Sequence, residues 1–208
     1  MAAASVAATA AATAFETGSR SHDIVRDDVA GYPGPRLGDL SLGPDGGDAA
    51  LVVLVFRRGK ANQAGAAQRV ALREWGQGAY GCSAATLLHE HVANMRSCGF
   101  TDDAPLFPEI RVTGRGLQHA SLDWSSPLRR PAWAAVVRAM FGASVTPHSL
   151  RAGFYTAATL GQAPEPAKRA QARWSSDTAY SYFRARPEET AAAVADAFER
   201  HAQDEHKG

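Results

Sequence analysis

Cysteine is scarce in this sequence, and its scarcity narrows the class of protein. Of the 208 residues, two are cysteines, Cys82 and Cys98. Two cysteines cannot build a disulfide framework, and these two lack the close spacing of zinc ligands. His89 and His91 lie two positions apart on a predicted helix, so their side chains diverge and are not expected to share a metal ion. We therefore expect a reduced, intracellular protein without a metal or other cofactor.

The sequence also lacks a hydrophobic segment long enough to cross a membrane. Its first fourteen residues, MAAASVAATAAATA, are Ala-rich, weakly apolar and free of Lys and Arg, and Glu16 ends the run. This composition excludes a secretion signal and a transmembrane helix, so we expect no membrane partner. An organelle transit peptide stays open, because Ser and Thr are present although Arg is absent.

A strong excess of one charge is missing as well, but the charges are unevenly distributed. The formal net charge is +1. Residues 55–184 hold 16 Lys or Arg against 8 Asp or Glu, whereas the two flanks together hold 6 against 13. A basic middle favours binding of phosphate groups, although basic residues clustered on solvated faces would give the same pattern.

The composition, 45% hydrophobic and 21% charged, is typical of one soluble globular domain. Alternating or Val-rich runs predict strands at 36–42, 51–56 and 66–72, with turns at 43–48 and 59–65. Helix-forming segments predict helices at 2–17, 21–29, 85–98, 127–141, 149–161, 164–173, 176–185 and from 187 onward. We therefore expect a mainly helical α+β fold with a small antiparallel sheet of two or three strands.

The stretch TPHSLRAG at 146–153 is the most specific part of the chain. It places His148 and Arg151 three residues apart at the start of a predicted helix, so both side chains project from one face. Candidate residues also occur in three other segments: TGSRSHDIV at 17–25, FRRGKANQAG at 56–65 and ARWSSDTAYSYFR at 172–184.

Taken in order, these segments resemble the catalytic domain of tyrosine recombinases, the phage integrase family. TGSRS resembles the segment with the family's first catalytic arginine, and the hairpin lysine is similar to the family's lysine between two strands. PHSLR is similar to the His-x-x-Arg box, and RWSSDTAYSYFR to the stretch with the His/Trp position and the nucleophile. The resemblance covers roughly residues 10–190 and implies six catalytic residues: Arg20, Lys60, His148, Arg151, Trp174 and Tyr182.

The chemistry that the resemblance implies explains these residue types. Arg20 and Arg151 would neutralise charge on a phosphate, because planar guanidinium groups donate paired hydrogen bonds to its oxygens. Tyr182 would attack the phosphorus while His148 accepts the phenol proton. Lys60 would protonate the departing 5′ oxygen. The indole N–H of Trp174 would donate to a phosphate oxygen, and the 3′-phosphotyrosyl product would preserve the bond energy for rejoining.

The resemblance also implies an architecture and partners. We expect the catalytic core fold of DNA breaking-rejoining enzymes at 1–186 and a C-terminal helix and tail at 187–208, without the family's N-terminal core-binding domain. The partners would be double-stranded DNA and further copies of the chain, assembled as a tetramer on DNA. The protein would act in the nucleus of a eukaryote or in the cytoplasm of a bacterium.

The segment before the nucleophile departs from the family pattern. Ala172 stands where the family usually has Gly, and the usual interval counted back from Tyr182 reaches Arg173 instead of Trp174. Arg173 and Trp174 therefore both remain candidates for the residue that donates to the phosphate oxygen. Tyr180 is an alternative nucleophile. Because Tyr180 and Tyr182 lie two residues apart on a predicted helix, they cannot both face the same phosphate.

Other interpretations of the candidate residues remain open. Arg20 could form an exposed salt bridge with Asp23, and Arg151 could be a structural ion-pair partner. His148 could be a satisfied helix-cap residue, and Trp174 could be part of the core. Arg57 or Arg58 could contact the phosphate in place of Lys60. Tyr155 is a third candidate nucleophile, but we expect it to pack in the core.

Three functions follow from the sequence. The preferred one is cleavage and rejoining of DNA in site-specific recombination or integration. The second is DNA binding by a catalytically inactive remnant of a mobile-element recombinase. The third is an Ala-rich helical interaction protein, whose binding would not depend on Arg20 and Arg151.

Overall fold

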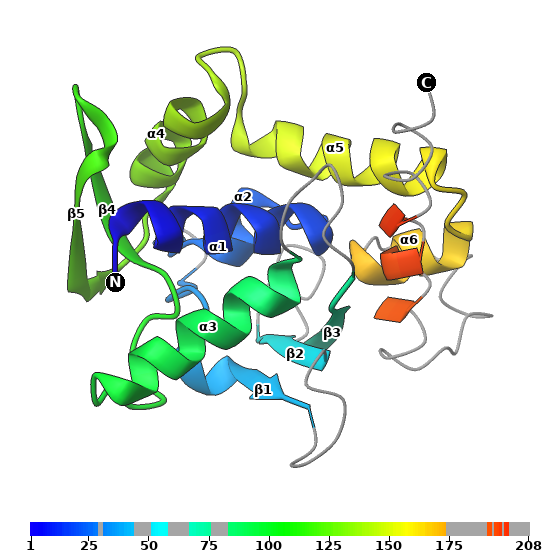
Figure 1. Ribbon diagram of the computed structural model, residues 1–208, viewed down its shortest axis with the longest axis horizontal. Coiled ribbons are helices and arrows are strands. Elements are labelled where there is room, and N and C mark those ends of the chain that lie inside the picture. Colours follow the sequence, from blue (N-terminus) through cyan, green and yellow to red (C-terminus); the bar gives the residue numbers. More distant parts are fainter. Residues whose placement is uncertain are drawn as a thin grey trace.

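The Ala-rich start of the chain forms a helix at the centre of the fold, α1 (Ala3–Glu16) (Figure 1). In this computed structural model the described residues are 1–28, 31–43, 51–57, 67–75, 83–173 and, within 191–199, all except 193 and 197. Most of α1 is buried, and its small side chains let a helix or strand approach it on several sides. It packs against α3, α5 and β5. The helix predicted at 2–17 is therefore confirmed.

A three-stranded antiparallel sheet contains β1 (Leu40–Leu42), β2 (Leu51–Phe56) and β3 (Gln68–Arg73), in that order. The strands predicted at 51–56 and 66–72 are confirmed, and Val53 lies opposite Ala71 in the pairing. The strand predicted at 36–42 is only half correct. Residues Leu37–Asp39 form a 3-10 helix, because the Asp39 carboxylate accepts the backbone N–H of Arg36 and so closes a turn there.

A second antiparallel sheet was not predicted. It is a hairpin of β4 (Pro108–Thr113) and β5 (Gly116–Pro127), and it stands at the edge of the molecule beside the first turn of α1 (Figure 1). Pro127 is still paired with Pro108 in this sheet. The helix predicted from 127 therefore begins three residues later, as α4 (Arg130–Phe141).

Four further predicted helices are present, with shifted ends. They are α2 (Ser21–Ile24), α3 (Ala84–Ser97), α5 (Pro147–Leu160) and α6 (Glu165–Gln171). The prediction of a helix over 21–29 was too long. Val25 is extended, and the backbone N–H of Arg26 donates to the carbonyl of Leu128 instead of continuing the helix. This contact ties α2 to the start of α4.

The last described residues are helical and pack onto the rest of the chain. Residues 191–192, 194–196 and 198–199 are helical, in agreement with the helix predicted from 187. The buried Phe198 ring contacts the rings of Phe15, Trp75 and Phe154, at centroid distances of 5.7, 5.8 and 6.3 Å. The turn predicted at 59–65 and the helix predicted at 176–185 lie outside the described residues, as does nearly all of the turn at 43–48.

The described part of the chain is therefore an α+β fold with two small antiparallel sheets of three and two strands. None of its helices is long and apolar enough to span a membrane.

Candidate functional site

The turn that follows α1 requires glycine at position 18. The N–H groups of Gly18 and Ser19 bond back to carbonyls of the last helical turn, and Gly18 has φ +51°, a left-handed conformation that glycine adopts without strain. Space is also short there. A Cβ on Gly18 would lie 2.8 Å from both Phe154 and Ala172. The turn is therefore held against α5 and the end of α6, and it delivers Arg20 to their side.

Arg20 immediately precedes α2 and is half-buried. Its backbone N–H donates to Oδ2 of Asp23 at 2.8 Å. Asp23 is buried, with 5% of its surface exposed, so its carboxylate lies inside the fold. The exposed Arg20–Asp23 salt bridge considered from the sequence is therefore not what forms: Asp23 caps the turn, and its closest ion pair is with Arg173, at 2.6 Å.

Arg151 approaches the same turn from α5. Pro147 opens that helix, and Arg151 follows one turn later, almost completely buried. Its Nη1 donates to the carbonyl oxygens of Gly18 and Ala172, the latter at 3.1 Å. Burial, followed by the nearby positive charges of Arg20 and Arg173, lowers the pKa of Arg151 to about 10. Arg20 and Arg151 are thus close enough for their charges to repel.

Arg173 is the third arginine whose side chain lies at the turn after α1. It follows α6 in a left-handed conformation, with φ +51°, and only 5% of it is exposed. Its Nη2 donates to Asp23 Oδ2 at 2.6 Å and to Ser19 Oγ at 3.1 Å. Its guanidinium carbon lies 3.7 Å from the centroid of the Phe56 ring, a cation–π contact with β2. Within the part of the chain that the structure describes, its buried Nη1 has no hydrogen-bond partner.

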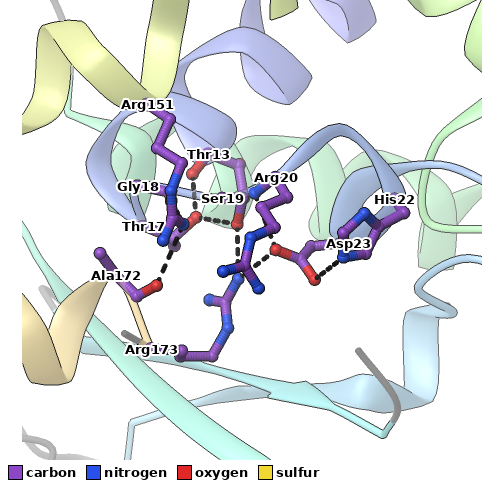
Figure 2. A network of polar contacts seen from close by, with 10 residues as sticks. All are labelled: Thr13, Thr17, Gly18, Ser19, Arg20, His22, Asp23, Arg151, Ala172 and Arg173. Carbon is purple, nitrogen blue, oxygen red and sulfur yellow. Dashed lines mark hydrogen bonds and ion pairs between the residues drawn. The ribbon is translucent and has the colours of Figure 1, made fainter. Parts of the chain in front are cut away.

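Figure 2 shows this arrangement, which we call the arginine cluster: Arg20, Arg151, Arg173 and Asp23. The side chains of Arg20 and Arg173 extend toward each other, and Arg151 reaches from α5 to the carbonyl of Gly18, beside them. The cluster therefore brings three guanidinium groups to the turn after α1, where the carboxylate of Asp23 pairs with Arg173. Guanidinium groups gathered in this way suit an oxyanion, because their forks match phosphate oxygens.

His148 lies one turn before Arg151 on the same helix and is exposed. The helix start is capped by its neighbours instead: the Ser149 hydroxyl accepts the backbone N–H of Thr146 at 3.1 Å. The interpretation of His148 as a cap residue is therefore wrong. Its side chain reaches solvent on the helix that carries Arg151.

Several predicted site residues lie outside the described part of the chain: Lys60, Trp174 and Tyr182, together with Arg58 and Tyr180. Arg57 is described. It is exposed and pairs with the buried carboxylate of Asp39.

Tyr155 was expected in the core, and this prediction was wrong. It is 39% exposed, and the ammonium group of Lys168 lies 4.8 Å from its ring centroid. The buried face of α5 passes instead through Leu150 and Phe154. A residue directly after Phe154 is rotated by about 100° from that face.

Sequence reasoning missed the ion pair between Asp23 and Arg173. The available signal was the position of Asp23 three residues after Arg20 at a helix start, where an acidic side chain commonly accepts a backbone N–H. Nothing local indicates the partner, which lies 150 positions away. No group of three or more His, Cys, Asp or Glu side chains suited to a metal ion occurs among the described residues.

No protein-family model matches the chain, and no curated protein matches it.

Proposed function

We propose that this protein cleaves and rejoins DNA strands through a tyrosine, in the manner of the tyrosine recombinases that its motifs resemble. The main support is the meeting of Arg20 and Arg151. These residues come from distant segments, yet Arg151 donates to the carbonyl of Gly18, two residues before Arg20. Both guanidinium groups would then contact the same phosphate, as the chemistry requires.

The proposed reaction balances without a metal ion or ATP. The phenolic oxygen of Tyr182 attacks the phosphorus of a phosphodiester while the exposed imidazole of His148 accepts its proton. The bond to the 5′ oxygen breaks, and Lys60 protonates the departing alcohol. Arg20 and Arg151 stabilise the charge on the non-bridging oxygens. The phosphotyrosyl link then returns the phosphate to a 5′ hydroxyl in the reverse reaction.

The partner would be double-stranded DNA. The basic residues of the middle of the chain would bind its phosphates, so affinity should fall as salt rises. Assembly of four copies on two duplexes would turn cleavage and rejoining into recombination or integration.

Covalent capture tests this function. The protein is incubated with nicked duplexes of randomised sequence, in which the cleaved piece diffuses away, and adducts that survive denaturant are counted. The wild type and Tyr180→Phe should form an adduct, whereas Tyr182→Phe should not. An adduct formed by Tyr182→Phe would refute the assignment of the nucleophile.

DNA binding without cleavage is a second candidate function, as expected of an inactive recombinase remnant. One observation favours it. Arg173 belongs to the segment that departs from the family pattern, and its side chain is already paired with Asp23. Salt-sensitive binding that requires Arg20 and Arg151, with no adduct on any duplex of the pool, would assign this function. Binding unchanged when both arginines are replaced by Glu would refute both DNA functions and leave the helical interaction protein.

A further inference from the structure

The edges of the three-stranded sheet are protected against pairing with another strand. An edge strand presents unpaired backbone N–H and C=O groups, which bind a further strand unless something blocks them. At one edge, β1 is only three residues long. At the other edge, β3 contacts α6, and the side-chain amide of Gln171 donates to the backbone carbonyl of Ala71 at 3.1 Å. One edge of this sheet is therefore short, and the other has a helix bonded to it.

The strand β5 of the other sheet lacks such protection. It is twelve residues long and pairs with β4 on one side. Apart from that pairing, residues 117–126 make no backbone-to-backbone hydrogen bond in the part of the chain that the structure describes. In Figure 1, β5 lies at the edge of the molecule, with no described helix or strand beyond it. Lys and Pro, which commonly block edge strands, are absent between Gly116 and Pro127. The outer edge of β5 is therefore open.

The middle of β5 has one apolar and one polar face. Ala120 and Leu122 pack against the core. Successive side chains of a strand point to opposite faces, so three polar residues lie on the other face: His119, Ser121 and Asp123. Of these, His119 and Ser121 are exposed. The polar face therefore has an imidazole two positions before Ser121 and a carboxylate two positions after it.

We propose that two copies of this protein pair through the open edges of β5, antiparallel about a two-fold axis at Ser121. In this register Ser121 faces its own counterpart, and His119 of each copy lies opposite Asp123 of the other. Only this centre places the imidazole opposite the carboxylate, whereas a centre at His119 or at Asp123 places like residues opposite each other. Arg111 of β4 already holds Asp123 on this face, at 2.8 Å. The imidazole N–H donates to that carboxylate twice per dimer, because the symmetry repeats every contact.

This interface goes beyond the proposed function and leaves the candidate site accessible. The β4–β5 hairpin stands beside the first turn of α1 (Figure 1), whereas the arginine cluster lies at the turn after the other end of that helix. The 14 residues of α1 span about 21 Å. Pairing of the two β5 strands therefore joins two hairpins into one four-stranded antiparallel sheet, with backbone hydrogen bonds across the axis, and keeps both arginine clusters away from the contact.

Cross-linking tests the register of this dimer. Ser121→Cys is made in a Cys82→Ser/Cys98→Ser background and oxidised with diamide. Residues opposite each other in an antiparallel pair have Cα atoms about 4.5 or 5.5 Å apart, within reach of a disulfide, so two copies should become joined. Ser41→Cys in the same background is the matched control, because Ser41 is exposed on the short edge strand β1. Equal cross-linking of Ser41→Cys and Ser121→Cys would overturn the register.

Charges placed on the two-fold axis test the pairing without cysteine. Ser121→Lys and Ser121→Glu each put two like charges opposite each other, so each variant alone should dimerise about fivefold more weakly than the wild type. An equal mixture of the two should form a mixed dimer more tightly than either variant alone, because Lys then faces Glu. Ser41→Lys should dimerise like the wild type. Sedimentation equilibrium without DNA gives the dissociation constants, and melting temperatures of the dilute variants report whether they fold.

Two results would overturn the proposal. A wild type that remains monomeric at about 0.1 mM would mean that the edge of β5 is left to a strand of another protein or stays unpaired. A dimer unaffected by Ser121→Lys and Ser121→Glu would mean that another surface joins the copies. Neither substitution touches the arginine cluster, so covalent capture of DNA is scored separately and its failure leaves this interface standing.

Discussion

Asp23 and Arg173 form a buried ion pair, with 2.6 Å between Oδ2 and Nη2, across 150 positions of the chain. The pair joins the turn after α1 to the segment after α6. About 6–7% of each side chain is exposed, so solvent screens the pair little. Both the fold and the candidate site therefore depend on the same contact.

Removing one partner of this pair should cost much more than removing both. Asp23→Ala leaves the Arg173 charge buried among the charges of Arg20 and Arg151, which we expect to lower the free energy of unfolding by about 3–5 kcal/mol. Asp23→Asn/Arg173→Gln removes both charges of the pair and should cost less than Asp23→Ala. Urea unfolding in phosphate-free buffer gives both values.

The exposed pair Arg111–Asp123 is the control for this comparison. Its side chains are 64% and 26% exposed, and an exposed ion pair contributes about 0–1 kcal/mol. Equal losses of unfolding free energy for Asp23→Ala and Asp123→Ala would show that the buried pair stabilises the fold no more than the exposed one.

Gly18→Ala should be more damaging than the same change at another left-handed glycine. Gly18 combines φ +51° with contacts that a Cβ would make at 2.8 Å, whereas Gly99 has φ +80° and nothing within 4 Å. Gly99→Ala therefore measures the backbone strain alone, about 1 kcal/mol. Gly18→Ala adds a clash with Phe154 and Ala172, and we expect a loss of about 2–4 kcal/mol. Thermal and urea unfolding of the two variants give the comparison, and similar losses at both positions would contradict it.

Sequence patterns were sufficient where the determinants are local. The Ala-rich run of α1, the Val-rich run of β2 and the apolar spacing of α3 each fall within one element, and periodicity identifies such elements. The hairpin of β4 and β5 was missed because β5 is only partly buried and shows no clean alternation. Its available signal was the turn with Gly114 and Gly116 between two short polar-apolar runs.

The candidate site was only partly predictable for a different reason. Arg20 and Arg151 follow from motifs that resemble a family, and the structure brings them together around Gly18. The pairing of Asp23 with Arg173 depends on how α6 ends against the turn after α1, which no local pattern records. The exposure of Tyr155 depends on the rotation of α5 about its axis, and a shift of one residue decides it.

Glu16 should make the stability of the fold depend on pH. It is 4% exposed, and burial raises the pKa of its carboxyl from 4.5 to about 8, although the backbone N–H of Ala84 donates to it at 2.6 Å. Between these two values the unfolded chain has released the proton and the folded chain still holds it. Stability should therefore fall as pH rises through this window, by on the order of a few kcal/mol.

Glu16→Gln tests this linkage, because an amide keeps an oxygen for Ala84 but does not ionise. Urea unfolding of both proteins at about pH 5 and about pH 8 gives the two slopes. The variant should lose less stability than the wild type over this range. Parallel slopes would mean that the carboxyl ionises in the folded protein as easily as in the unfolded chain.

Phe198 should anchor the C-terminal residues to their own chain. Its ring is 2% exposed and stacks on Phe15 while it contacts Trp75 and Phe154. Phe198→Ala leaves a cavity among these aromatic rings, and we expect a loss of about 3–5 kcal/mol in the free energy of unfolding. Phe141→Ala is the matched control, because Phe141 is 48% exposed at the end of α4 and should change stability by about 0.5 kcal/mol or less. Both variants are measured by urea unfolding at several protein concentrations. A loss that is independent of concentration supports docking within one chain, whereas a loss that appears only at high concentration would mean that Phe198 contacts a second copy.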